Sequence, residues 1–213
     1  ESSLLKGKGM GSSTADIVGV IAGVMNSLHN DIDLNLIKKI ALTIEPTDCT
    51  FLSGINIFDH IQGNKEVNLG DPPPIDILIF SEEGEIDTVD FNRNRELYAL
   101  KQEKETMVKK AVDLVKEGIK NQNRKLIGKG ATVSSLAHQN ILYKSSLPPI
   151  KKIVDTISGV YGICIAHSGT LIGLLVDPEL DWHHLIKKIK IINSGLEYIT
   201  RTSLISGGIE IIK

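Results

Sequence analysis

The 213-residue sequence has only two cysteines, one tryptophan and 4% aromatic residues, and it shows no excess of charge of either sign. Two cysteines are too few for a disulfide framework, so we expect Cys49 and Cys164 to be free thiols. The 24 basic and 26 acidic side chains give a formal charge of -2, which provides no general attraction to nucleic acid. We therefore expect no nucleic-acid partner.

Long hydrophobic runs are also absent. No apolar stretch approaches the roughly 18 residues that a transmembrane helix needs, and no secretory signal opens the chain. We therefore expect a cytoplasmic protein with no membrane partner. The apolar content of 41% is nevertheless enough for a substantial core, which excludes a disordered chain.

The spacing of apolar residues predicts helices and strands in mixed order. In the first half of the chain, helices are predicted at 14–28, 34–42 and 94–119, and strands at 55–61, 75–80 and 85–91, the last two forming a hairpin. A further helix at 125–140 is weakened by Gly128 and Gly130. The remaining elements are a helix at 149–158, strands at 162–166 and 170–177, a helix at 181–192, and strands at 196–204 and 208–212. This order indicates an α+β fold with helices packed on one face of an antiparallel or mixed sheet.

The strongest motif lies close to the first residue and is followed at once by the first predicted helix. It reads Gly7-Lys8-Gly9-Met10-Gly11-Ser12-Ser13-Thr14-Ala15. Glycines allow a close backbone approach to a ligand, and a helix start offers unpaired N–H groups at the positive end of its dipole. The following hydroxyls suit helix capping, contact with a phosphate oxygen, or contact with phosphate-bound Mg²⁺. The motif is therefore interpreted as an anion cradle.

Two common phosphate-binding motifs do not match this spacing. A dinucleotide fingerprint requires a third glycine where this sequence has Ser12, and a Walker loop requires Gly-Lys-Ser/Thr after four spacer residues. Another interpretation is a flexible glycine turn before a serine-capped helix. The hydroxyl run and the amphipathic helix behind it favour phosphate binding.

The segment Gly9-Met10-Gly11-Ser12-Ser13-Thr14-Ala15 resembles the ATP-binding second motif of the GHMP kinases, which include galactokinase, homoserine kinase, mevalonate kinase and phosphomevalonate kinase. Glu45-Pro46-Thr47-Asp48 is similar to the acidic turn that carries a catalytic aspartate in several members. Ala166-His167-Ser168-Gly169-Thr170 resembles the third, glycine-bearing motif. The residues of these motifs are most similar to those of the L-threonine kinase branch, which serves the aminopropanol arm of cobalamin synthesis.

The resemblance implies a two-lobe GHMP kinase fold with a ribosomal-protein-S5-like N-terminal lobe and a ferredoxin-like C-terminal lobe. We expect an ATP-binding lobe at 1–121 and a C-terminal α+β lobe at 122–213, with the boundary near 121–123. Family members carry further chain, with a first motif, before the second motif. The sequence is therefore expected to be the back portion of a longer protein, with an incomplete N-terminal lobe.

The resemblance also assigns roles to individual residues. ATP and phosphate contacts are expected from the cradle residues Lys8, Gly9, Met10, Gly11, Ser12, Ser13 and Thr14. Asp48 is the expected catalytic base, and Mg²⁺ is expected at Ser12, Ser13 or Glu45. The third-motif residues His167, Ser168 and Gly169 are expected near the substrate. Taken alone, Asp48 is also typical of a turn after proline, Glu45 of a solvated helix end, and His167 of a structural turn histidine.

These assignments predict a kinase that transfers the γ-phosphoryl group of ATP to the hydroxyl of L-threonine, with ATP and Mg²⁺ as cofactors. Two alternatives remain open at this point. One is a GHMP kinase for another small alcohol, such as homoserine or a mevalonate-pathway intermediate. The other is a nucleotide-binding module without catalysis.

Overall fold

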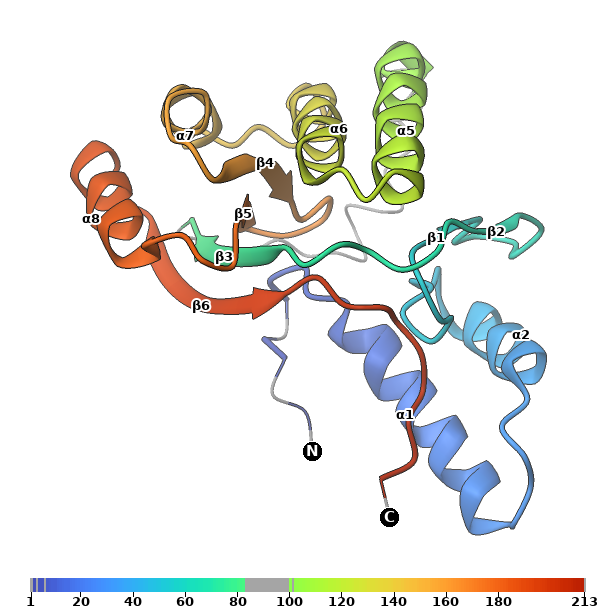
Figure 1. Cartoon of the computed structure of the whole chain (residues 1–213). Coiled ribbons are helices and arrows are strands. Elements are labelled where there is room, and N and C mark those ends of the chain that lie inside the picture. The colour runs from blue at the N-terminus through green and yellow to red at the C-terminus, as the bar shows by residue number, and fades with distance from the viewer. Residues whose placement is uncertain (1, 3, 6, 83–99, 101, 213) are drawn as a thin grey trace. The chain divides into compact units, whose positions relative to one another are not determined.

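The computed structural model describes residues 2, 4–5, 7–82, 100 and 102–212 (Figure 1). Its contacts divide the chain into two compact units. The first unit comprises Glu1–Lys6, Gly11–Pro72 and Ile205–Lys213, and the second comprises Gly7–Met10 and Pro73–Leu204. The glycine-rich motif is thus shared, because the chain passes from the second unit to the first between Met10 and Gly11.

The first unit contains two helices and a short antiparallel pair of strands. They are α1 (Ser12–Ser27), α2 (Leu34–Ile44), β1 (Asn56–Phe58) and β2 (Glu66–Asn68). The helix expected at 14–28 is confirmed, and Val18, Ala22 and Met25 on it are buried in one cluster with Ile37 and Phe51. The apolar stripe that predicted the helix is not its buried face, because Val20, Val24 and Leu28 are exposed. The α2 helix begins where the Asp33 carboxylate accepts two backbone N–H groups, which caps its first turn.

Two strand predictions for the first unit differ from the structure. The β2 strand was not predicted, because Glu66–Asn68 is exposed throughout and has no apolar alternation to mark it. The strand expected at 208–212 is wrong. Gly207 makes one isolated β-bridge, to Gly54, and residues 208–212 form no strand. A Cβ on Gly207 would lie 2.5 Å from the Leu52 carbonyl oxygen, so the chain here packs closely against a loop and does not extend a ladder.

The second unit is built on a four-stranded antiparallel sheet in the order β4-β5-β3-β6. Its strands are β3 (Asp76–Ser81), β4 (Val160–Ile165), β5 (Leu171–Val176) and β6 (Glu197–Ser203). Its helices are α5 (Glu105–Lys120), α6 (Arg124–Ala137), α7 (Leu147–Val154) and α8 (Trp182–Ile192). The strand expected at 85–91 and the start of the helix expected from Asn94 lie outside the described residues.

The core of the second unit lies between the sheet and helices α7 and α8. Every residue of β5 is buried, and Ile172 and Leu174 are completely enclosed, as are Leu147 of α7 and Ile189 of α8. In Figure 1, α6 and α7 lie over the same face of the sheet, and both contact β4. This arrangement confirms the α+β class and the antiparallel sheet with helices on one face.

The glycines of α6 explain why this helix forms despite its weak propensity. A Cβ on Gly128 would lie 2.1 Å from the Tyr161 carbonyl oxygen of β4, and one on Gly130 would lie 2.8 Å from the Ala111 carbonyl oxygen of α5. The helix can therefore approach both neighbours closely. Two of its hydroxyls then complete the backbone bonds of edge strand β4, because Thr132 accepts from the Ile163 amide and Ser135 donates to the Ile163 carbonyl.

The boundary predicted between residues 121 and 122 falls in the turn that joins α5 to α6. Both helices belong to the second unit and pack on each other there. The division into lobes at this position stays a prediction. Within the described residues, no helix is both long enough and apolar enough to cross a membrane.

Candidate active site

The part of the glycine-rich motif that lies in the first unit forms the start of α1. Gly11 occupies the N-cap position with φ of 67°, a left-handed conformation that a residue with a side chain rarely adopts. Its carbonyl accepts the Ala15 amide, which begins the helix. No side chain caps this first turn, so its N–H groups, at the positive end of the helix dipole, are available to an anion.

Thr14 ties the acidic turn to the helix start. Its side chain is 3% exposed, and its hydroxyl shares a hydrogen bond of 3.2 Å with the Thr47 hydroxyl. The same Thr14 oxygen accepts the Asp48 amide at 3.1 Å. These bonds join residues 33 and 34 positions apart in the sequence. The second motif and the acidic turn, which the sequence analysis linked only by resemblance, are therefore neighbours in the first unit.

The Asp48 carboxylate lies beside Gly11. A Cβ on Gly11 would be 3.0 Å from the Asp48 Oδ2 atom, so the absence of a side chain at Gly11 makes room for the carboxylate. The pKa of Asp48 is raised above its ordinary value, chiefly because crowding by protein atoms removes water from the carboxylate. His60 opposes this rise through its positive charge, while the negative charge of Glu45 adds to it.

The predicted magnesium residues are all oxygen donors in the first unit. Ser12 and Ser13 form the first positions of α1, and Glu45 is the half-buried C-cap residue of α2, three positions before Asp48. Hydroxyl and carboxylate oxygens fit the preference of Mg²⁺ for hard ligands. Among the described residues, no three His, Cys, Asp or Glu side chains gather into a closed metal site. A small set of protein oxygens suits Mg²⁺, which is usually held by one or two protein ligands together with substrate phosphates.

The remaining part of the motif, Gly7–Met10, packs in the second unit against the turn between β4 and β5. A Cβ on Gly9 would lie 2.5 Å from the Ala166 Cβ atom, and one on Gly169 would lie 2.1 Å from the Lys8 carbonyl oxygen. Gly7 and Gly9 both have positive φ angles, of 69° and 89°. The second unit thus brings the glycine loop and the third motif into direct backbone contact, which the sequence analysis did not predict.

Two residues that the sequence analysis missed hold the 167–169 turn. The ammonium group of Lys144, 2% exposed, donates to the Gly169 carbonyl oxygen at 2.5 Å. The His138 Nε2 atom lies 2.8 Å from the His167 carbonyl oxygen, and the His138 and His167 rings are 4.7 Å apart. Lys144 lies in a polar connection without periodicity, and His138 follows a helix end, so neither carries a sequence signal that sets it apart.

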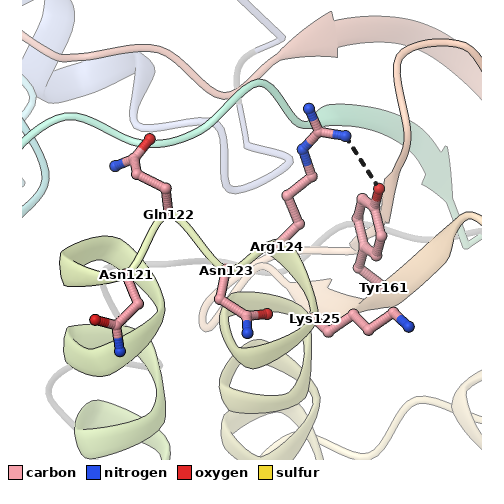
Figure 2. Close-up of a pocket in the computed structure, with 6 residues that line it drawn as sticks. All are labelled: Asn121, Gln122, Asn123, Arg124, Lys125 and Tyr161. Carbon is pink, nitrogen blue, oxygen red and sulfur yellow. Dashed lines mark hydrogen bonds between the residues drawn. The ribbon is translucent and has the colours of Figure 1, made fainter.

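A separate pocket of about 330 Å³ lies at the α5–α6 turn (Figure 2) and contains none of the predicted site residues. Figure 2 shows Arg124 reaching the Tyr161 hydroxyl, and the same guanidinium pairs with the Asp177 carboxylate at 2.9 Å. Because this pairing neutralises the arginine charge, the pocket is a poor candidate for the phosphate site.

Two curated proteins are similar to the chain in sequence. No family model matches the chain. It is 32% identical over 189 residues to the L-threonine kinase of Salmonella typhimurium and 28% identical over 210 residues to that of Citrobacter freundii. These alignments include 89% and 96% of this chain, and they span 61% and 71% of the two relatives' own length.

Solved GHMP kinase structures share the fold. A homoserine kinase from Cytophaga hutchinsonii superimposes with a TM-score of 0.66 at 16% identity, covering 97% of this chain and 69% of that chain. The L. major mevalonate kinase, solved with R-mevalonate, gives a TM-score of 0.64 at 12% identity, with the same two coverages. The expected GHMP kinase fold is therefore confirmed.

Proposed function

We propose that the protein is an ATP-dependent kinase that transfers the γ-phosphoryl group to the hydroxyl of L-threonine and forms O-phospho-L-threonine. Similarity to two proteins named L-threonine kinase supports this acceptor. The observation that best supports catalysis is the position of the Asp48 carboxylate beside the start of α1, which no side chain caps. A Cβ on Gly11 would be 3.0 Å from the Asp48 Oδ2 atom. A base next to an anion site is the arrangement that phosphoryl transfer to an alcohol requires.

In this proposal the glycine-rich motif binds the nucleotide phosphates. The N–H groups at the start of α1 and the positive end of its dipole stabilise phosphate charge. Lys8 adds a positive charge, and Gly9 and Gly11 let the backbone approach the phosphates. Met10 and Thr14 complete the segment. The hydrogen bonds of the buried Thr14 hold the acidic turn beside the start of α1.

Asp48 then acts as the general base that accepts the proton of the substrate hydroxyl. Its raised pKa makes it a stronger proton acceptor than an ordinary aspartate. Ser12, Ser13 and Glu45 are the residues proposed to hold Mg²⁺ together with the nucleotide. The metal would supply charge neutralisation on the β- and γ-phosphates. His167, Ser168 and Gly169 are proposed to lie near the substrate.

The proposed product places the reaction in cobalamin synthesis, and a cytoplasmic location is proposed with it. The test measures ADP release from ATP and Mg²⁺ with L-threonine, L-serine, L-homoserine and mevalonate in parallel, using the complete gene product. L-threonine is expected to give the highest kcat/KM. Strong turnover of another alcohol with none of L-threonine would overturn the acceptor, and nucleotide binding without turnover of any alcohol would overturn catalysis.

A further inference from the structure

The turn between β4 and β5 is held from the side of the α6 C-terminus by two donors. Lys144 donates to the Gly169 carbonyl and His138 contacts the His167 carbonyl, so two peptide oxygens of this short turn have a partner. A charge-assisted bond from an ammonium group is stronger than a neutral one. The two bonds therefore hold the turn at two of its three residues.

The protonation of His138 follows from its neighbours. The Lys104 ammonium lies 3.0 Å from His138 Nδ1, and an ammonium group can only donate. Nδ1 is therefore the acceptor, and Nε2 carries the hydrogen that is donated to the His167 carbonyl. Burial, with a smaller contribution from the neighbouring His167, lowers the pKa of His138 to about 4, so the ring is neutral at pH 7.

The position of Lys144 is itself fixed by its backbone. The Gln139 side chain accepts the Lys144 amide at 2.8 Å and donates to the Lys144 carbonyl at 3.1 Å. Both polar groups of this residue's backbone are therefore satisfied by one side chain. The Lys144 ammonium group therefore reaches the turn from a backbone that Gln139 holds in place. Gln139 follows directly after His138 in the chain.

Fixing the carbonyls also fixes the neighbouring amides. A trans peptide is planar, and its C=O and N–H bonds point in opposite directions. No cis peptide occurs among the described residues. The Ser168 and Thr170 N–H groups therefore point away from His138 and Lys144. In the same turn, Gly169 packs closely against the backbone of Lys8. A Cβ on Gly169 would lie 2.1 Å from the Lys8 carbonyl oxygen.

We infer that Lys144 and His138 are positioning residues that orient the third-motif turn and, through Gly169, the Lys8–Gly9 segment of the phosphate loop. The inference rests on the proposed phosphate-binding role of that loop. Neither side chain needs to touch nucleotide or substrate. Their action passes through the two carbonyls, which set both the direction of the turn's amides and the place of the loop backbone.

The buried ammonium itself argues for this role. A methionine has similar length and fills similar volume without the desolvation penalty of a charge, so apolar packing alone does not require lysine. The pKa of Lys144 is lowered by this burial. What lysine adds over methionine is the donor to Gly169. We therefore expect Lys144→Met to keep or raise the thermal stability while it releases the turn.

The direct test is hydrogen exchange of the amides of residues 166–170 in the complete gene product. Lys144→Met and His138→Leu are expected to speed exchange there about tenfold or more, because each removes one of the two bonds. His138→Gln, whose amide nitrogen can replace Nε2, is expected to restore slow exchange. Lys129→Met is the matched control, since Lys129 is an exposed lysine of α6. Unchanged exchange in Lys144→Met and His138→Leu would overturn the inference.

Kinetics separate this inference from the proposed function. Lys144→Met and His138→Leu are expected to lower kcat/KM for ATP about tenfold, because the loosened turn no longer positions the phosphate loop. His138→Gln should recover most of the loss. Normal ATP kinetics in both variants would overturn the inference and leave the kinase standing. Faster exchange of the turn in the two variants, combined with a wild-type protein that phosphorylates no alcohol, would uphold the positioning of the turn and reject the proposed function.

Discussion

The start of α1 and the 167–169 turn are held in place by different chemical groups. In the first unit, a neutral hydroxyl of Thr14 bonds Thr47 and the Asp48 amide. In the second unit, a buried ammonium and a buried imidazole bond the carbonyls of the 167–169 turn. A neutral hydroxyl keeps its bonds across the whole ordinary pH range, whereas an imidazole gains a proton in acid. The bonds of Thr14 are therefore insensitive to pH, whereas the contacts of His138 are not.

The largest effect that distinguishes the regions is expected from Asp48→Asn in the first unit. The amide keeps the size of the side chain but cannot accept the substrate proton, so kcat should fall about 100-fold or more. KM for ATP should change less than about threefold, because the phosphate loop is intact. Steady-state kinetics check both values.

Asp31→Asn is the control for this variant, because Asp31 is an exposed residue of the loop that follows α1. It should keep the wild-type kcat. If Asp48→Asn also keeps it, the carboxylate is not the base, and the acidic turn has only a structural role.

Glycine substitutions compare the close packing of the two regions. Gly169→Ala places a Cβ 2.1 Å from the Lys8 carbonyl oxygen, which is backbone and has little room to move, so we expect about 2 kcal/mol or more of lost stability. Gly11→Ala imposes a positive φ on alanine and should cost about 1–2 kcal/mol. Urea unfolding measures these losses, and kcat/KM should fall in both variants.

Gly19→Ala serves as the matched control. This glycine lies within α1, and a Cβ there would meet nothing within 4 Å. Alanine should therefore raise stability by up to about 1 kcal/mol through its better helix propensity. A Gly169→Ala protein as stable as the wild type would contradict the close contact between the turn and the phosphate loop.

The last prediction concerns the pH sensitivity of the second unit. His138 has a pKa of about 4 in the folded protein, against an ordinary value of 6.5, chiefly because burial disfavours the charged ring. The unfolded chain therefore takes up the proton first, and the free energy of unfolding should fall as the pH drops from about 6.5 to about 4. The loss attributable to this group is about 1–3 kcal/mol.

Urea unfolding at several pH values between 7 and 4.5 measures this dependence. In His138→Gln the part of the slope that belongs to this histidine should disappear, whereas His29→Gln, at an exposed site in the first unit, should keep the wild-type slope. Equal slopes in all three proteins would show that His138 is not the group that titrates.

Local patterns in the sequence predicted most of the elements near the site. The apolar spacing of α1, the proline after α2 and the turn between β4 and β5 all act over a few residues, so each could be recognised directly. The strand expected at 208–212 failed because alternation reports only local preference. Whether a strand forms depends on a partner, and Gly207 meets only a single bridge at Gly54.

The amino-acid sequence by itself determined the glycine-rich helix start and the acidic turn, since these depend on residue types at short spacing. Only the tertiary structure decided which side chains hold these segments in place. Lys144 and Gly169 are 25 positions apart, and Thr14 and Asp48 are 34 apart. No propensity or period connects such pairs. Packing of α6 on β4, and of the acidic turn on α1, brings each donor within bonding distance of its acceptor.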